Sequence, residues 1–126
     1  MARILIAEDE PSVRELVVRA LEADGHNVVD TADGGAALDT LIRENGGFDL
    51  LLTDIKMPVM DGIALALAVA RDFPKLPIVM MTGYADQRER ASGLSALIHD
   101  VITKPFSLGD IRAAVNAALA ASKVMH

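Results

Sequence analysis

The sequence of 126 residues contains no cysteine and no tryptophan, and aromatic residues make up only 3% of it. Without cysteine the chain has neither a disulfide framework nor a thiolate metal site, which fits a reducing compartment. Because hydrophobic residues still account for 52% of the chain, the core must consist mainly of Ala, Val, Ile, Leu and Met. A domain of this length buries roughly two-thirds of its unfolded surface. We therefore expect residues 1–126 to form a single domain.

Positive charge and long apolar runs are also scarce. The chain has 18 acidic and 12 basic residues and a formal net charge of -6, which argues against binding along a nucleic-acid backbone. The apolar run that begins at Ile4 is too short for a signal peptide and meets Glu8 and Asp9 at once. The most apolar helical segment, residues 63–70, is about a third of a membrane span. We expect a cytoplasmic protein with neither a nucleic acid nor a membrane as partner.

Five short apolar segments alternate along the chain with five segments of helical periodicity. The run from Leu50 to Asp54 indicates a strand buried on both faces, which is typical of parallel sheets. Parallel strands need right-handed crossovers, so the predicted α/β fold is a doubly wound, five-stranded parallel sheet with five helices in three α/β/α layers. The expected strands cover residues 3–7, 27–31, 50–54, 76–82 and 100–103. The expected helices begin near residues 12, 34, 63, 85 and 108, and the third and fourth extend to residues 73 and 92.

Capping residues mark several of the expected helix starts. Ser12 and Ser107 are each followed three residues later by an acid, Glu15 and Asp110, which is the spacing of a capping box. Asp33 is expected to cap the second helix. These signals predict where three of the five helices begin.

Apolar positions indicate which helix faces are buried. Stripes at helical spacing include Leu16, Ile42 and Leu108, so we expect these side chains to lie in the core. The segment 63–73 is apolar nearly all round, and its helix is therefore expected to be covered on more than one side.

Polar residues stand where four of the predicted strands end. Glu8 and Asp9 follow the first strand, Asp54 ends the third, Thr82 ends the fourth and Lys104 follows the fifth. The carboxyl ends of parallel strands share one edge of the sheet, so these side chains are expected to converge there. Three carboxylates repel one another unless a cation lies among them, and Mg²⁺ is the best-suited cation because it accepts carboxylate and phosphate oxygens.

Such a set of groups matches the needs of phosphoryl transfer, where catalysis is mostly positioning and charge neutralisation. Asp54 is the candidate nucleophile, which would carry the phosphoryl group as an acyl phosphate. It leaves the central strand with the acidic residues on one side and Lys104 on the other. The Lys104 amine would neutralise a phosphoryl oxygen, and the Thr82 hydroxyl would donate to another.

Together these motifs resemble the receiver domain of bacterial two-component response regulators. The similarity covers essentially all 126 residues, and it implies a flavodoxin-like fold with strand order 2-1-3-4-5. Because it fills the chain, we expect no output domain. The matching pieces are Glu8-Asp9, Asp54 with Met57-Pro58 and Asp61-Gly62, Thr82-Gly83, and Lys104-Pro105-Phe106.

The resemblance assigns roles to the matching acidic residues. It implies that Asp54 is the phosphoacceptor, that Asp9 is a direct Mg²⁺ ligand and that Glu8 is an outer-sphere partner. Asp54 and the backbone carbonyl of Lys56 would complete the protein's share of the coordination. The Lys104-Pro105 bond is typically cis in this family.

The resemblance also implies a switch built on Thr82 and Lys104, with one departure from the usual pattern. Thr82 would swing toward the phosphoryl group and Lys104 would pair with it. Many receivers carry an aromatic residue near the lysine, whereas this chain has Val101 at the matching position. Tyr84 and His99 are alternative partners for the threonine, and Val101 is also simply a good strand residue.

A narrower similarity concerns residues 81–90, which resemble the stand-alone receivers of the CpdR type from α-proteobacteria. Those proteins act as adaptors in cell-cycle proteolysis, and receivers fused to hybrid histidine kinases share much of the same segment. The resemblance implies a histidine kinase or phosphotransfer protein as phosphoryl donor and a further protein as downstream partner. It implies a regulator, not an enzyme, that assists only its own phosphorylation and dephosphorylation.

Two other functions remain open at this point. A haloacid-dehalogenase-like phosphatase also uses a strand-end aspartate and Mg²⁺, but it needs a second acid where this chain has Lys56. A receiver fold that binds partners without phosphorylation is the other alternative. The side chains of Lys56 and Tyr84 either approach the phosphoryl group or remain solvated, and the sequence favours neither arrangement.

Overall fold

The computed structural model describes residues 2–83, 93, 94 and 96–124. Strands and helices alternate from residue 3 to residue 82, and the helix expected over residues 85–92 lies outside the described residues. The elements are β1 (Arg3–Ala7), α1 (Pro11–Ala23), β2 (Asn27–Thr31), α2 (Gly34–Arg43), β3 (Leu50–Asp54), α3 (Gly62–Asp72), β4 (Ile78–Thr82), β5 (Asp100–Thr103) and α5 (Leu108–Val124).

The five strands form one parallel sheet in the order β2-β1-β3-β4-β5, which confirms the predicted doubly wound topology. In the register of the central pair, Asp54 lies opposite Met81. Four strands have the predicted bounds. β4 begins at Ile78, two residues later than predicted, because Pro77 has no N–H to donate to a ladder.

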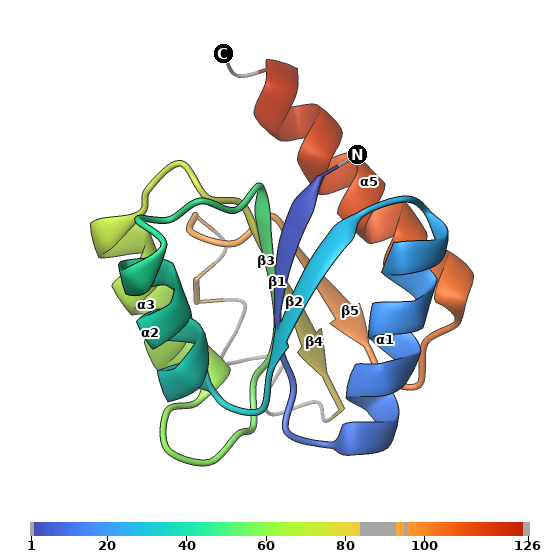
Figure 1. Ribbon diagram of the computed structural model, residues 1–126, viewed down its shortest axis with the longest axis horizontal. Coiled ribbons are helices and arrows are strands. Elements are labelled where there is room, and N and C mark those ends of the chain that lie inside the picture. The colour runs from blue at the N-terminus through green and yellow to red at the C-terminus, as the bar shows by residue number, and fades with distance from the viewer. Residues whose placement is uncertain (1, 84–92, 95, 125–126) are drawn as a thin grey trace.

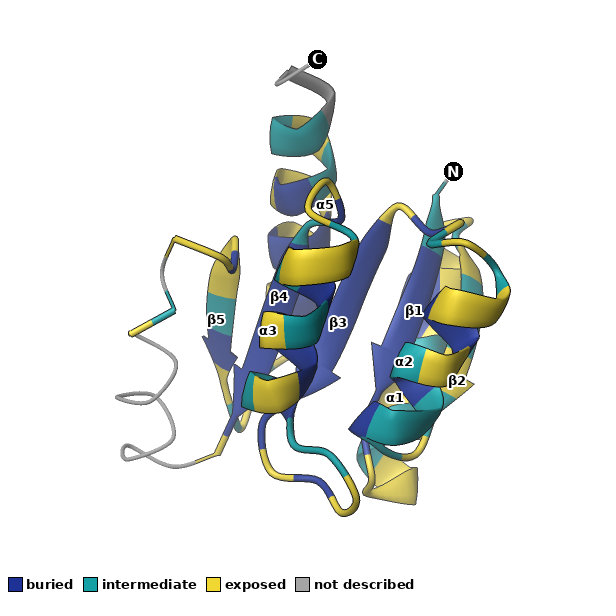
Figure 2. Ribbon diagram, turned by 90° about the vertical axis from the view of Figure 1, so that its left-hand side faces the viewer, coloured by how far each residue is buried: buried dark blue, intermediate teal, exposed yellow. Residues whose placement is uncertain are grey.

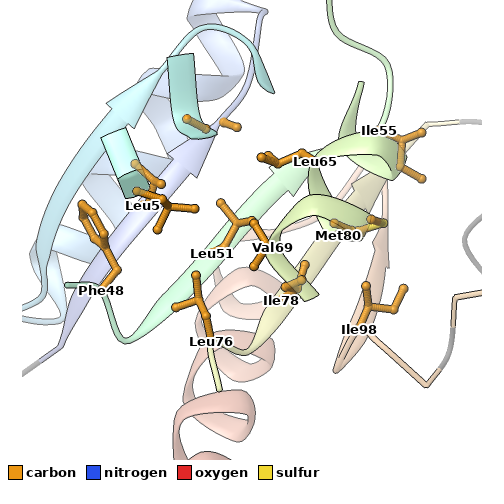
Figure 3. Packing of buried hydrophobic residues seen from close by; sticks show 14 of the residues in the cluster. Leu5, Phe48, Leu51, Ile55, Leu65, Val69, Leu76, Ile78, Met80 and Ile98 are labelled. Atoms are coloured by element: carbon orange, nitrogen blue, oxygen red, sulfur yellow. The ribbon is translucent and has the colours of Figure 1, made fainter. Parts of the chain in front are cut away.

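Helices cover both faces of the sheet, with α2 and α3 on one side and α1 and α5 on the other (Figure 1). Each helix layer encloses its own hydrophobic cluster against the sheet. In the cluster under α2 and α3, Leu65 and Val69 pack beside Leu51 and Ile78 (Figure 3). The central strands β3 and β4 are wholly buried, whereas the edge strands β2 and β5 are partly exposed (Figure 2).

One of the two predicted capping boxes forms. At the start of α5, Ser107 Oγ accepts from the Asp110 N–H at 3.0 Å, and Asp110 Oδ2 accepts from the Ser107 N–H at 2.9 Å. The Asp33 cap of α2 is also confirmed, since Asp33 Oδ1 accepts from the Ala36 N–H at 2.7 Å.

The box predicted at Ser12 and Glu15 is wrong. α1 begins at Pro11, and its N-cap residue Glu10 makes no side-chain cap hydrogen bond. Proline is favoured at the first helical position because its fixed φ suits a helix and it has no N–H to satisfy. Pro11 therefore starts the helix before Ser12 can serve as its cap.

Several apolar side chains predicted to be buried are exposed. Leu16, Ile42 and Leu108 expose 43%, 57% and 41% of their surface. α3 is also covered on one side only, because Leu67 is exposed while Leu65 and other residues of the opposite face are buried. The apolar stripes are thus wider than the strip of each helix that contacts the sheet. Among the described residues, no helix has both the length and the apolar character needed to span a bilayer.

Candidate functional site

Several of the predicted site residues meet at the carboxyl edge of the sheet, the lower edge in Figure 1. Glu8 and Asp9 follow β1, Asp54 ends β3 and Lys104 follows β5. One carboxylate oxygen from each of the three acids lies within 4.8 Å of the others. Glu8 and Asp54 are buried, whereas Asp9 is exposed at the mouth of the site. The parallel topology thus brings residues from distant parts of the chain into one acidic cluster.

Lys104 bridges two of these acids. Its Nζ atom donates to Glu8 Oε1 at 2.8 Å and to Asp54 Oδ2 at 3.1 Å. The second oxygen of Glu8 accepts from the Glu10 N–H at 3.3 Å. Asp54 Oδ1 accepts from the Ile55 N–H at 2.8 Å. Each buried carboxylate is therefore held by at least two donors, which fixes its orientation.

Burial and charge shift the pKa of two groups. Burial raises the pKa of the Glu8 carboxyl from 4.5 to about 7, because the pull of Lys104 is partly cancelled by the neighbouring Asp54. Burial by itself lowers the pKa of the Lys104 amine, but the hydrogen bond to Glu8 and the charges of Asp54 and Glu8 outweigh it and raise that pKa above its usual value. The cluster therefore favours cations and holds Lys104 charged.

Gly62 fixes the main chain beneath Asp54. Its N–H donates to the Ile55 carbonyl at 2.7 Å. A Cβ atom added at Gly62 would lie 2.0 Å from the Asp54 carbonyl oxygen and 2.9 Å from Ile55 Cα. Only glycine fits this contact, which explains in physical terms why Asp61-Gly62 accompanies the strand-end aspartate.

Thr82 ends β4, one residue beyond the register partner of Asp54, and it is fully buried. Its carbonyl oxygen accepts from the Lys104 N–H at 2.7 Å, which ties the ends of β4 and β5 together. The Lys104-Pro105 peptide is cis, as the resemblance implied. Val101 is half-buried and packs against the cluster under α2 and α3. His99 is exposed, and Tyr84 lies outside the described residues.

A cavity of about 780 Å³ opens beside the acidic cluster. Asp9, Asp54, Lys56 and Lys104 line its polar side. The apolar part of its lining comes from α1 and the segment after β5: Val13, Leu16, Pro105 and Phe106. Sequence reasoning missed this apolar lining, because the helical spacing of Leu16 is equally that of a core residue.

The donor set fits Mg²⁺. Carboxylate oxygens are hard ligands, and one or two of them with water and phosphate oxygens are the usual environment of this ion. Asp9 and Asp54 both line the cavity, so an ion held by them would be open to a substrate. Lys56 lies two residues after Asp54 and lines the same cavity. Lys104 lines the cavity as well, and its amine pairs with one carboxylate oxygen of Asp54.

The fold and this site define a phosphoacceptor receiver, and the chain belongs to the response regulator receiver domain family, whose model matches residues 4–116. Members of this family are phosphoacceptor regulators of two-component signalling. The chain is 40% identical over 111 residues to the response regulator receiver protein CpdR of Brucella abortus, which covers 88% of this chain and 91% of that protein.

Other relatives are longer. The transcriptional regulatory protein TcrA of Mycobacterium tuberculosis is 34% identical over 115 residues, which is 91% of this chain but only 45% of TcrA. The chain thus spans less than half the length of some relatives that it matches. Activities of those whole proteins do not transfer with the receiver fold alone.

Solved structures share the whole fold. A CheY-like receiver domain protein from Methanospirillum hungatei superimposes with a TM-score of 0.90 at 29% identity, over 100% of this chain and 99% of that chain. The response regulator TrrA from Thermotoga maritima, solved in complex with Mg²⁺-BeF, gives a TM-score of 0.83 at 28% identity, over 94% and 99% of the two chains.

Proposed function

We propose that this chain accepts a phosphoryl group on Asp54 in a Mg²⁺-dependent reaction and thereby changes its affinity for a protein partner. The observation that carries the proposal is the acidic cluster. Three carboxylates converge within 4.8 Å at the end of β3, and Lys104 Nζ lies 3.1 Å from Asp54 Oδ2. Asp54 also lines the open cavity, so a phosphodonor has access to it.

In the proposed reaction, an oxygen of Asp54 attacks the phosphorus atom of a phosphohistidine. The new P–O bond forms as the P–N bond breaks, and the imidazole, which carries a proton on its other ring nitrogen, takes the electron pair of that bond and leaves as the neutral ring. The nucleophile of this step is the carboxylate form of Asp54. Mg²⁺, when bound, would neutralise charge on the phosphoryl oxygens.

Each neighbour of Asp54 has a proposed part. Asp9, Asp54 and the backbone carbonyl of Lys56 would bind Mg²⁺, and Glu8 would orient the outer coordination sphere. Lys104 would pair with a phosphoryl oxygen in place of its present contact with Asp54 Oδ2. The Thr82 hydroxyl at the end of β4 would turn toward the same group and couple it to the rest of the fold.

The proposed output is a protein contact. The 40% identity to CpdR over 91% of that protein supports a receiver regulator with a histidine kinase or phosphotransfer protein as donor. A cytoplasmic location belongs to the same proposal. An adaptor role in proteolysis, as the resemblance to the CpdR type implies, is the corresponding proposal for the downstream partner. Like other receivers, the chain would assist only its own phosphorylation and dephosphorylation.

Acetyl phosphate with Mg²⁺ provides the test. Intact-mass spectrometry should show one added phosphoryl group that is labile to hydroxylamine, as an acyl phosphate is. Asp54→Asn should abolish the adduct, whereas Asp39→Asn, which removes an exposed carboxylate of α2, should retain it. A folded wild type that forms no adduct would overturn the proposal. Sustained turnover of phosphomonoesters would instead indicate a phosphatase, and unchanged partner binding after phosphorylation would indicate a static binding module.

A further inference from the structure

Arg14, in the first turns of α1, contacts the main chain of Glu8 and the side chain of Asp30. Its Nη1 atom donates to the main-chain carbonyl oxygen of Glu8 at 2.9 Å. Its Nε atom lies 3.4 Å from Asp30 Oδ2 on β2. The Arg14 side chain is largely buried, with 23% of its surface exposed. One guanidinium therefore connects α1, β2 and the carbonyl that leads from Glu8 into Asp9.

The main chain at Glu8 is held from two directions. Its N–H donates to the Thr31 carbonyl at 3.1 Å, and Thr31 Oγ1 in turn donates to the Ile6 carbonyl at 2.7 Å. The Glu8 carbonyl, on the other side of the residue, accepts from Arg14. β2 thus fixes one side of Glu8, and Arg14 fixes the peptide that joins Glu8 to Asp9.

This peptide needs a tether because regular pairing has ended. The last pairs in register along β1 are Ala7 with Thr31 and Ala7 with Thr53, so Asp9 lies beyond the ladder. Asp9 is also exposed, and its carboxylate lies close to two buried acids that repel it. Rotation of the Glu8-Asp9 peptide would turn the Asp9 carboxylate away from Asp54.

We propose that Arg14 is a positioning residue for the metal site: by fixing the Glu8-Asp9 peptide it holds the Asp9 carboxylate where it binds Mg²⁺ together with Asp54. This inference rests on the proposed function, which assigns Mg²⁺ to that cluster. Arg14 itself contacts neither the metal nor the phosphoryl group. Its effect on affinity is of the kind that outer-shell groups exert on metal ligands.

The direction in which substitution of Arg14 changes the Mg²⁺ affinity distinguishes positioning from simple electrostatics. Removing a positive charge near a cation site strengthens cation binding if charge alone matters. Loss of the tether weakens binding, because Asp9 must then be ordered when the ion binds. Arg14→Gln removes the charge together with the contacts to the Glu8 carbonyl and Asp30, so the two explanations predict opposite changes in Mg²⁺ affinity.

Calorimetric titration of the full chain with Mg²⁺ alone tests the proposal. Arg14→Gln should raise the Mg²⁺ dissociation constant by about tenfold. Arg14→Lys, which keeps the charge but not the fork of donors, should fall between wild type and Arg14→Gln. Arg19→Gln is the matched control, because Arg19 is exposed on the same helix and pairs only with Glu15 among the contacts described. Its Mg²⁺ affinity should be unchanged.

Two further readouts distinguish positioning from a loss of stability. In metal-free protein, amide hydrogen exchange at Glu8, Asp9 and Glu10 should accelerate in Arg14→Gln but not in Arg19→Gln. With acetyl phosphate, Arg14→Gln should need more Mg²⁺ for half-maximal phosphorylation, while its maximal rate at saturating Mg²⁺ recovers. A merely structural role would lower the melting temperature without changing the Mg²⁺ requirement.

The outcomes are separable. Equal or tighter Mg²⁺ binding by folded Arg14→Gln would overturn this inference and leave the proposed function intact. If that variant fails to fold, Arg14→Lys decides: weaker binding supports the inference and equal binding overturns it. A wild type that binds no Mg²⁺ would overturn the proposed function itself, and this inference with it.

Discussion

Lys104 and Glu8 form an ion pair whose carboxylate is fully buried while its amine stays in contact with solvent. Nζ lies 2.8 Å from Oε1, and 22% of the Lys104 side chain is exposed against none of Glu8. The two partners therefore respond differently to pH and to competing cations. Burial raises the pKa of the Glu8 carboxyl, whereas burial lowers the pKa of the Lys104 amine and is outweighed there by the hydrogen bonds and charges of Glu8 and Asp54 together.

The metal-free protein should lose stability as pH rises from about 4.5 to about 7. Within that window the folded state, in which the Glu8 pKa is about 7, binds more protons than the unfolded state, where it is 4.5. The free energy of unfolding then falls with pH, by up to about 3 kcal/mol. The raised pKa of Lys104 contributes stability that is fully present below its unfolded value of 10.5, so it does not change within this window. Urea denaturation in EDTA at several pH values measures how the free energy of unfolding changes with pH.

Glu8→Gln provides the control for this slope. The variant should show a flatter pH dependence between pH 4.5 and 7, whereas Glu15→Gln, at an exposed site on α1, should keep the wild-type slope. Identical slopes for wild type and Glu8→Gln would rule out the raised pKa as the cause. Because protons compete with Mg²⁺ for the same carboxylates, stabilisation by Mg²⁺ should also be larger at the upper end of this range.

Replacing Lys104 with Met should strengthen Mg²⁺ binding while it destabilises the metal-free protein. The ammonium competes with Mg²⁺ for Asp54 and neutralises Glu8, so its removal frees the ligand and leaves the charge of both acids to attract the ion. Without an ion the buried carboxylates lose their partner, at a cost of about 3 kcal/mol. Melting curves with and without Mg²⁺ should show a larger metal-induced shift than wild type. An equal shift for Lys104→Met and the exposed-site control Lys75→Met would contradict this competition.

Local sequence signals predicted the site better than the details of the helices. The run from Leu50 to Asp54 is apolar up to the aspartate, which indicated a buried strand, and the parallel topology then placed its end near Glu8 and Lys104. Helix faces were harder to predict, because a stripe at helical spacing shows where apolar residues lie and not how wide the contact with the sheet is. Leu16 has core spacing, yet it lines the cavity.

The proposed role of Arg14 could not be predicted from the sequence either. Its partners are a main-chain carbonyl and an acid on a neighbouring strand, and neither contact leaves a spacing signal in the sequence. A solvated arginine on the exposed face of α1 would have the same sequence. Only the three-dimensional register of α1 against β1 and β2 distinguishes the two.

The two serines with capping-box spacing should respond differently to substitution. Ser107→Ala removes the acceptor of the Asp110 N–H and should cost about 1 kcal/mol of unfolding free energy. Ser12 lies inside α1, where its Oγ is 3.4 Å from Glu10 Oε1 and caps no backbone group, so Ser12→Ala should change stability by less than about 0.5 kcal/mol. Urea denaturation of both variants measures the difference. Equal costs would mean that Ser12 contributes to the start of α1 after all.

Substitution of two helix-start glycines should have effects of opposite sign. A Cβ at Gly62 would meet two backbone atoms, the Asp54 oxygen at 2.0 Å and Ile55 Cα at 2.9 Å, so neither neighbour can yield without moving the end of β3. Gly62→Ala should therefore cost at least about 2 kcal/mol and also weaken Mg²⁺ binding, because Asp54 must shift.

Gly109, at the start of α5, is the matched control for Gly62. The nearest atom to an added Cβ there is Ser107 Oγ, at an ordinary contact distance of 3.6 Å. Gly109→Ala should stabilise the protein by up to about 1 kcal/mol, since alanine is the better helix former, and it should leave Mg²⁺ affinity unchanged. Urea denaturation and Mg²⁺ titration of both variants decide the matter. If Gly62→Ala were as stable as Gly109→Ala and bound Mg²⁺ equally well, the close contact beneath Asp54 would not be what requires glycine at this position.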